Sequence, residues 1–176
     1  MTTWFSTDHH FGHKNIIRFC NRPFASVEEM DAALIERWNS VVEYDDTVYH
    51  LGDFSLSGDA EYVQGVFGRL LGHVVMLRNE QHHDKRWLRN RHEYRTCSGP
   101  VEWLPPLYTL DVDAVVVLCH FPLEVWDRRH YGSLHLHGHS HGKASKVPGR
   151  LDVGVDCWDY YPVSWEQVRQ ESIGNV

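Results

Sequence analysis

The sequence has no close cysteine pair, no long apolar run and no leader of basic residues followed by apolar ones. Its cysteines are far apart and form no CxxC pair, which is typical of reduced thiols and does not fit a closed structural zinc site: Cys20, Cys97, Cys119 and Cys157. No apolar stretch reaches about 18 residues, so we expect no membrane span and no secretory signal. These absences favour a cytoplasmic protein.

Internal repeats, low-complexity segments and linker-like stretches are also missing. The length of 176 residues therefore predicts one domain over 1–176. Positive charge is in deficit, since 17 Lys and Arg face 24 Asp and Glu, a net charge of −7. Stable nucleic-acid binding through a broad basic surface is therefore not expected. A small phosphate ester remains possible as a substrate where a bound metal supplies positive charge.

The pattern of apolar residues predicts alternating strands and helices. Strands are expected at 2–8, 46–53, 73–78, 101–112 (a pair around Pro105-Pro106), 113–120, 133–141 and 149–156. Helices are expected at 14–21, 26–42, 59–72, 84–94 and 163–170. Ser26 and Glu29 have the spacing of a capping box at the start of the second helix. This order predicts an α/β fold with a partly mixed sheet.

Histidine is unusually abundant, and many of the 14 histidines cluster just past predicted strands. Five strand exits carry metal-ligand side chains: Asp8 with His10, Asp53, the cluster Asn79–Asp84, His120, and His139 with His141. In α/β sheets, sites form outside the carboxyl ends of strands. We therefore expect the five exits to converge, whereas His9, His135 and His137 alternate with the candidates and are expected to point away.

The candidate side chains define a particular metal chemistry. Carboxylates, imidazoles and an amide oxygen suit Mn, Fe, Co, Ni or Zn, of which we favour Mn. There are more candidate ligands than one tetrahedral ion needs. Two divalent ions about 4 Å apart, bridged by one carboxylate, would use all of them. Each fragment alone is a weak signal, and the prediction depends on all five occurring in order at strand exits.

The order DxH, GD, NH(D), H and GHxH, from Asp8 to His141, resembles that of the calcineurin-like metallophosphoesterase family. The extension HFGHKNIIRFCNRPF and the tail LDVGVDCWDYYPVSWEQV resemble the small bacterial and phage members. This resemblance implies a four-layer sandwich of two mixed β-sheets flanked by helices. It also implies a phosphodiesterase that acts on small phosphodiesters or (cyclic) nucleotides. A phosphomonoesterase, a nuclease and a catalytically weakened metal-binding protein of the same fold stay open as alternatives, and so does the oligomeric state.

The resemblance also implies a role for each residue of the motifs. The first metal would be held by Asp8, His10 and His141, and the second by His120, His139 and an asparagine. Asp53 would bridge the two ions. His83 would be the general acid that protonates the leaving oxygen, with Asp84 orienting its ring. His13 and Arg22 lie close to the first motif, and Arg fits phosphate in a bidentate manner, so we predict that both contact the substrate.

The third motif departs from the Gly-Asn-His-Asp of that family. This chain reads Arg78-Asn79-Glu80-Gln81-His82-His83-Asp84. If the strand end fixes the register, Asn79 is the amide ligand. If the following helix fixes it, His82 takes the place of the asparagine. We favour Asn79, because the strand exit sets the distance to the metal; His83 and Asp84 keep their roles in both registers.

Overall fold

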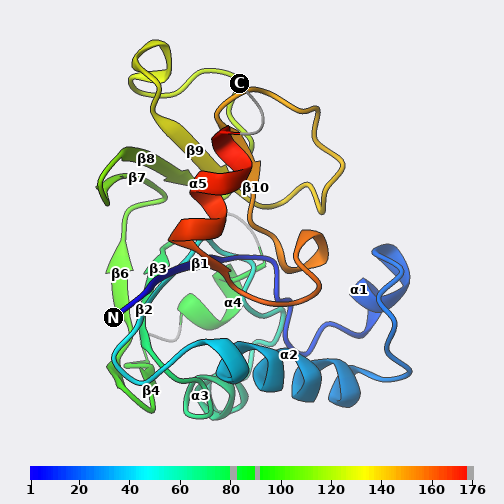
Figure 1. The fold of residues 1–176 in the computed structure, drawn as a ribbon. Helices are drawn as coiled ribbons and strands as arrows, with labels where there is room; N and C mark the ends of the chain where they lie inside the picture. The colour runs from blue at the N-terminus through cyan, green and yellow to red at the C-terminus, as the bar shows by residue number, and fades with distance from the viewer. Residues whose placement is uncertain (80–82, 90–91, 174–176) are drawn as a thin grey trace.

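The computed structural model describes residues 1–79, 83–89 and 92–173, and its frame is a pair of mixed β-sheets (Figure 1). The first sheet has the order β11-β1-β2-β3-β6. Its parallel strands are β1 (Thr3–Ser6), β2 (Thr47–His50), β3 (His73–Leu77) and β6 (Glu102–Leu104). The short β11 (Val163–Ser164) pairs antiparallel with β1 at the edge. The parallel strands therefore present their carboxyl ends at one side of the sheet.

The second sheet has the order β10-β9-β8-β7. Its strands are β7 (Leu107–Asp111), β8 (Val115–Cys119), β9 (Leu134–His137) and β10 (Arg150–Asp152). The last three run parallel, and β7 is antiparallel to β8. A small hairpin of β4 (Arg95–Thr96) and β5 (Gly99–Pro100), which the sequence did not predict, lies outside both sheets.

The strands predicted on either side of Pro105-Pro106 belong to different sheets. β6 pairs with β3 in the first sheet, whereas β7 pairs with β8 in the second. Proline has no N–H to donate to a sheet ladder, so two consecutive prolines end one pairing. The chain crosses from sheet to sheet at this point.

The helices are α1 (Lys14–Phe19), α2 (Val27–Val41), α3 (Ala60–Phe67), α4 (Lys85–Leu88) and α5 (Trp165–Ile173), with 3-10 turns η1 (Arg129–Tyr131) and η2 (Val155–Cys157). No described helix is long and apolar enough to cross a bilayer. At the start of α2, the Glu29 N–H donates to Ser26 Oγ (3.2 Å) as predicted. The Glu29 carboxylate instead accepts from the N–H of Ala25 (2.7 Å), one residue earlier than in a capping box.

Two apolar cores fix the layers. Side chains of α2, α3 and α4 pack on the outer face of the first sheet, with Trp38, Phe67 and Trp87 fully buried. The opposite face meets the second sheet through a cluster that joins Phe5 and Leu51 to strand residues of β8 and β9. α5 covers the same cluster through Val168, which is fully buried. The first sheet is therefore covered on both faces, as expected for a mostly parallel sheet.

On the outer face of the second sheet, His135 is locked in its neutral form. It is fully buried, its Nδ1 lies 2.9 Å from the carbonyl of Val117, and its Nε2 accepts from the N–H of Leu123 (3.0 Å). Because Nε2 accepts a hydrogen bond, the proton is on Nδ1. Burial lowers the pKa of His135 to about 4. Protonation of this ring therefore opposes folding.

We expect the free energy of unfolding to fall as pH drops from about 6.5 towards about 4, because in this range the unfolded chain binds a proton at His135 that the folded chain excludes. A single such group contributes up to about 1.4 kcal/mol per pH unit. Urea unfolding at several pH values would show a shallower dependence in His135→Gln than in the wild type. The exposed His130→Gln is the control and should leave the slope unchanged. Equal slopes in all three proteins would contradict this assignment.

Candidate metal centre

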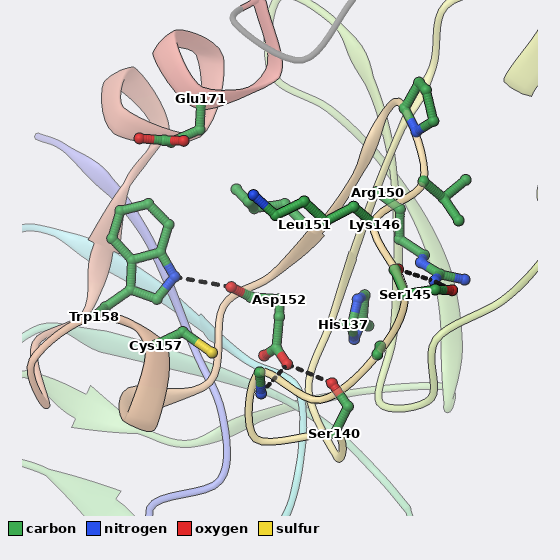
Figure 2. Close-up of a pocket in the computed structure, with 14 residues that line it drawn as sticks. His137, Ser140, Ser145, Lys146, Arg150, Leu151, Asp152, Cys157, Trp158 and Glu171 are labelled. Carbon is green, nitrogen blue, oxygen red and sulfur yellow. Dashed lines mark hydrogen bonds between the residues drawn. The ribbon is translucent and has the colours of Figure 1, made fainter.

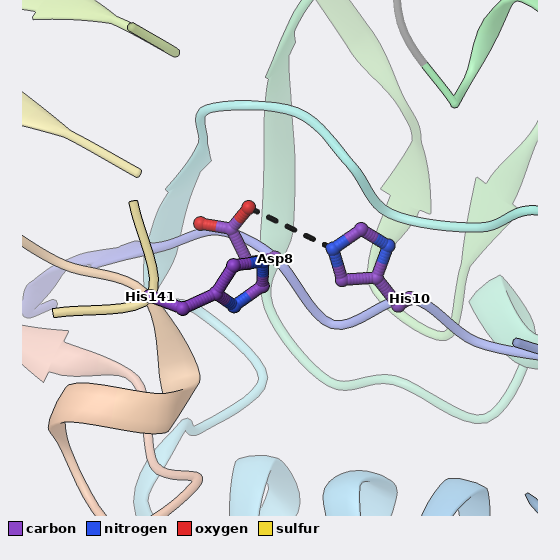
Figure 3. A group of neighbouring side chains, drawn as sticks. All are labelled: Asp8, His10 and His141. Carbon is purple, nitrogen blue, oxygen red and sulfur yellow. Dashed lines mark ion pairs between the residues drawn. The ribbon is translucent and has the colours of Figure 1, made fainter. Parts of the chain in front are cut away.

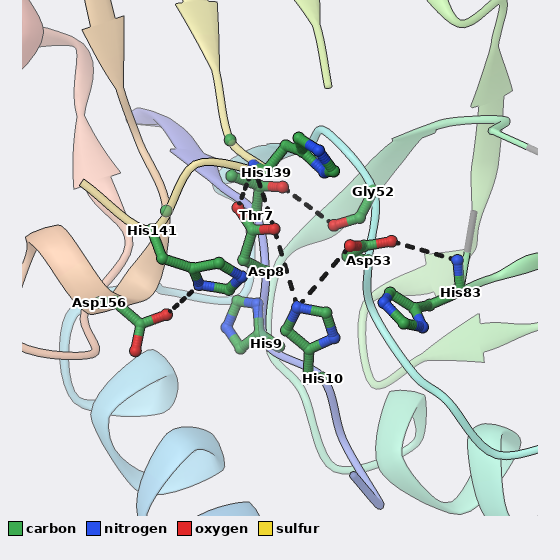
Figure 4. Close-up of polar contacts among 12 residues, drawn as sticks. Thr7, Asp8, His9, His10, Gly52, Asp53, His83, His139, His141 and Asp156 are labelled. Atoms are coloured by element: carbon green, nitrogen blue, oxygen red, sulfur yellow. Dashed lines mark hydrogen bonds and ion pairs between the residues drawn. The ribbon is translucent and has the colours of Figure 1, made fainter. Parts of the chain in front are cut away.

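Predicted ligands from four strand exits meet where the two sheets adjoin; Figure 4 shows Asp8, His10, Asp53, His139 and His141. Asp8 and His10 follow β1, and Asp53 follows β2. From the other sheet, His120 follows β8, and His139 and His141 follow β9. The strands within each set run parallel, so their carboxyl ends share one side of the sheet.

These side chains form two groups, and the Asp53 carboxylate of the second group lies next to His10 of the first. Potential ligand atoms of Asp8, His10 and His141 all lie within 4.8 Å of one another, and so do those of Asp53, His120 and His139 (Figure 3 shows the first group). Asp53 Oδ2 lies 3.7 Å from His10 Nε2 and 3.4 Å from His120 Nε2. Asp53 therefore sits between the groups, where a bridging ligand would lie.

The backbone at these positions is strained. Ten non-glycine residues in the described part of the chain have a positive φ, and five of them are candidate ligands: Asp8 (62°), His10 (56°), Asp53 (51°), His139 (65°) and His141 (46°). A left-handed conformation costs on the order of 1–3 kcal/mol for such residues and persists where the surroundings enforce it. Strain concentrated in this way is typical of functional sites.

The side chains have the unmet polar capacity that a metal would satisfy. His10 is 1% exposed, and neither ring nitrogen forms a hydrogen bond with a described residue. Burial lowers its pKa well below the usual value, which leaves a neutral imidazole with a free lone pair. Burial also raises the pKa of Asp8 to about 6, against the opposing effect of His120 and His141. Buried groups of this kind fit divalent cations, because a cation would compensate their desolvation.

A glycine brings the last motif against the first. The backbone N–H of His139 donates to Asp8 Oδ2 (2.9 Å). A Cβ on Gly138 would collide with the Asp8 carboxylate and with the side chain of Thr7. Only glycine allows this close approach of the two loops.

Arg22 does not lie in the site as a substrate ligand, and this prediction was wrong. Its side chain is buried and donates to Asp156 through Nε and Nη2, both at 2.8 Å. The remaining donors reach the carbonyls of His9 (2.8 Å) and Asp8 (2.7 Å) and the Met30 sulfur. No N–H is left for a phosphate, and the guanidinium instead braces the turn that carries the first motif.

Asp156 is a functional residue that the sequence reasoning missed. Its Oδ2 lies 2.7 Å from His141 Nδ1. Although burial lowers the pKa of His141, the hydrogen bonds to Asp156 and Cys20 and the negative charges of Asp8 and Asp156 together raise it to about 10. A carboxylate on one nitrogen orients a histidine so that its other nitrogen can bind a metal. The available signal was its place at the end of the predicted strand 149–156, a sixth strand exit.

The third motif is described in part. Asn79 is buried just past β3, and His82, the alternative ligand, lies outside the described residues, so Asn79 stays the predicted ligand. His83 is half-buried, and its backbone N–H donates to Asp53 Oδ1 (3.4 Å). Its ring centre lies 5.0 Å from that of His10 and 5.5 Å from that of His13. His83 and His13 therefore border the centre together.

The sequence predicted that the Asp84 carboxylate orients the ring of His83, but in the structure the hydrogen bonds of Asp84 go elsewhere. Its Oδ1 accepts from the Ser55 N–H (3.0 Å) and from Trp87 Nε1 (2.9 Å), and its Oδ2 has no hydrogen bond to a described residue. Burial, reinforced by Asp53, raises its pKa to about 7. A Cβ added to Gly52 would lie 3.3 Å from His120 Nδ1 and 3.8 Å from Asp84 Oδ2. The side chains of Asp84 and His120 therefore both lie against Gly52.

The histidines that alternate with the candidates turn away, as expected. His9 Nδ1 lies 3.0 Å from His50 Nε2, and the His9 ring packs on Phe11 and Trp38 in the apolar core. His50 Nδ1 accepts from the N–H of Gly52 (3.2 Å). The buried His9–His50 pair therefore supports the turn formed by Gly52 and Asp53.

Proteins of other organisms are similar in sequence to most of this chain. The uncharacterized protein MJ1445 of Methanocaldococcus jannaschii is 32% identical over 176 aligned residues, which cover 92% of this chain and 86% of that protein. The gene 66 protein of Mycobacterium phage L5 is 30% identical, with 89% and 87% covered. The gene 66 protein of phage D29 is 26% identical. The chain belongs to the family of these proteins.

A solved structure shares the fold. The crystal structure of the protein of unknown function AQ665 from Aquifex aeolicus matches with a TM-score of 0.72 over 97% of this chain and 98% of that one. At 18% identity this likeness concerns the fold alone. No family model matches the sequence.

We expect Arg22→Met to lower the free energy of unfolding by about 3–5 kcal/mol, because it leaves two backbone carbonyls buried without a donor and takes the guanidinium away from Asp156, which keeps only His141. The matched control is Arg37→Met, which breaks the exposed pair with Asp159 and should cost no more than about 1 kcal/mol. Urea unfolding measures both.

The double variant Arg22→Met/Asp156→Asn should recover part of the loss, since it removes the carboxylate charge that Arg22 compensates while the amide oxygen can still accept from His141. A loss in Arg22→Met no larger than that in Arg37→Met would show that the buried pair does not brace the centre.

Proposed function

We propose that the protein is a phosphoesterase that depends on two divalent metal ions and hydrolyses small phosphodiesters. The observation that carries this proposal is the place of the buried Asp53 carboxylate between buried imidazoles of the two groups, His10 and His120. One ion needs fewer ligands than this cluster offers, whereas a bridged pair uses them all. The motif order that resembles the calcineurin-like metallophosphoesterases supports the same function.

The four-layer sandwich implied by that resemblance is part of the proposal. Helices, the first sheet and the second sheet supply three of its layers. For the fourth, we assign residues 121–133, which include η1, to the outer face of the second sheet. In support, Leu123 donates to His135 on that face, and Trp126 packs on the same ring at 5.4 Å.

The residues fit the two ions as follows. Asp8, His10 and His141 would hold the first, His120, His139 and Asn79 the second, and Asp53 both. Mn is favoured, and Fe, Co, Ni or Zn suits the same donors. When bound, the ions would supply positive charge to the phosphoryl oxygens and make a water nucleophile available near neutral pH.

The remaining chemistry belongs to side chains of the chain itself. His83, half-buried at the edge of the centre, would donate a proton to the leaving oxygen of the ester. Its backbone hydrogen bond to Asp53 fixes its distance from the site. His13 borders the same space and would contact the substrate. Asp84 would position His120, and the Arg22–Asp156 pair would position His141.

The substrate is proposed to be a small phosphodiester such as a nucleotide or cyclic nucleotide. The net charge of −7 disfavours long nucleic acids, which depend on cationic contacts along the backbone. A panel of 2′,3′- and 3′,5′-cyclic nucleotides, phosphomonoesters and single-stranded nucleic acid, tested on Mn-loaded protein, separates these classes. Turnover of none of them by protein that binds two ions would instead favour a metal-binding protein without catalysis.

We expect His83→Ala to lower kcat by about 10²–10⁴-fold on a cyclic nucleotide, because an alkoxide leaves poorly without a proton donor. The loss should be much smaller on a nitrophenyl diester, whose leaving group needs no proton. Metal content per chain should not change. His130→Ala, an exposed histidine far along the chain, is the control and should retain full activity.

Two outcomes would overturn the role of His83. Full turnover of the cyclic nucleotide by the variant would remove His83 from proton transfer. Loss of bound metal in parallel with activity would make it a ligand instead, since its ring lies close enough to His10 and Asp53 to share an ion.

A further inference from the structure

A cavity of about 590 Å³ lies next to the candidate metal centre but contains none of its predicted ligands (Figure 2). Its walls come from the loop after β9, from β10, from η2 and from α5. This volume falls in the range typical of small-molecule sites, roughly 300–1,000 Å³. The proposed phosphoesterase chemistry gives the cavity no role.

Only a thin stretch of chain separates the cavity from the metal centre. Ser140 and Gly142 line the cavity, whereas His139 and His141 beside them point towards Asp8 and His120. Asp152 Oδ2 holds this loop by accepting from Ser140 Oγ (2.6 Å) and the Gly142 N–H (3.0 Å). A ligand in the cavity would therefore rest on the back of the loop that carries two metal ligands.

The cavity offers a cation without a partner. Lys146 is exposed but points into it (Figure 2), forms no ion pair or hydrogen bond with any described residue, and shares the cavity with the carboxylate of Glu171. The loop wall around Lys146 is fixed, because Arg150 donates to the carbonyl of Ser145 (2.6 Å) from the edge of the second sheet. The carboxylate of Asp152 is occupied by its own hydrogen bonds, which include the Gly154 N–H (2.8 Å). Lys146 is thus free to pair with an anion.

The cavity also offers an aromatic wall. Trp158 is half-buried, and its Nε1 donates to the carbonyl of Asp152 (2.8 Å), which fixes the orientation of the indole. Leu151 adds apolar surface nearby. A rigid indole presents a face on which a planar ring stacks at low entropic cost.

We propose that this cavity binds a small organic anion that carries a planar ring, with its anionic group on Lys146 and its ring against Trp158. A nucleoside monophosphate has this chemistry. Bound there, it would pack on Ser140 and Gly142 and restrict the loop that holds His139 and His141. The proposal does not depend on the hydrolase activity.

Calorimetric titration of the full chain with AMP tests this site. A chelator keeps divalent ions from drawing the phosphate into the metal centre. Adenosine supplies the ring without the anion, and inorganic phosphate supplies the anion without the ring. We expect AMP to bind at least about tenfold more tightly than either, since each lacks one of two contacts, and about 1.4 kcal/mol is tenfold in Kd.

Lys146→Glu should weaken AMP binding at least about tenfold, because it reverses the charge that faces the anion. Lys143→Glu is the matched control: it is exposed in the same loop, lies outside the cavity lining and should leave the affinity unchanged. In the wild type, AMP should also slow amide hydrogen exchange across residues 140–150.

Three results would overturn the proposal. The first is no binding of AMP at millimolar concentration, and the second is equal affinity of AMP for Lys146→Glu and the wild type. The third is binding of inorganic phosphate as tight as that of AMP, which would leave Trp158 without a role. Each of these results leaves the metal-dependent hydrolysis untouched, so failure here and failure of the proposed function can be told apart.

Discussion

The carboxylate of Asp53 lies where residues from both sheets meet, and the candidate metal centre depends on it. It lies within 4 Å of an imidazole from each sheet, His10 and His120, and it accepts the backbone N–H of His83 from the third motif. Parallel strands bring these residues to one place, and Asp53 and His10 have left-handed backbones there. A cluster of buried carboxylates and imidazoles is unfavourable by itself, so the rest of the structure has to hold it together.

The Arg22–Asp156 ion pair supplies much of that support. The guanidinium grips the carbonyls of Asp8 and His9 while it pairs with Asp156, and Asp156 in turn fixes His141. One side chain thus links the first strand exit to the last. The loop that carries His141 is held from its other side by Asp152, where the 590 Å³ cavity begins. The metal-ligand loop therefore lies between a structural brace and a candidate ligand site.

The sequence predicted what depends on local pattern. Strand exits follow from short apolar runs that end in Asp, Asn or His, and Asp8, Asp53, His120 and His139 were found in this way. Contacts between distant residues were not readable: Arg22 and Asp156 are 134 positions apart, so Arg22 looked like a free phosphate ligand. Asp84 was assigned to its neighbour His83, whereas its hydrogen bonds go to Ser55 and Trp87. The sequence also did not reveal that the chain crosses between the sheets at Pro105-Pro106, because tertiary packing decides which strands pair.

The central claim is that Asp53 bridges two metal ions. The most direct measurement is anomalous diffraction from crystals of Mn-loaded protein. The account predicts two peaks about 4 Å apart on either side of Asp53, one also bound by Asp8, His10 and His141, the other by His120 and His139. A single ion, or an ion held instead by Cys20, His141 and Asp156, which also lie within reach of one another, would contradict it.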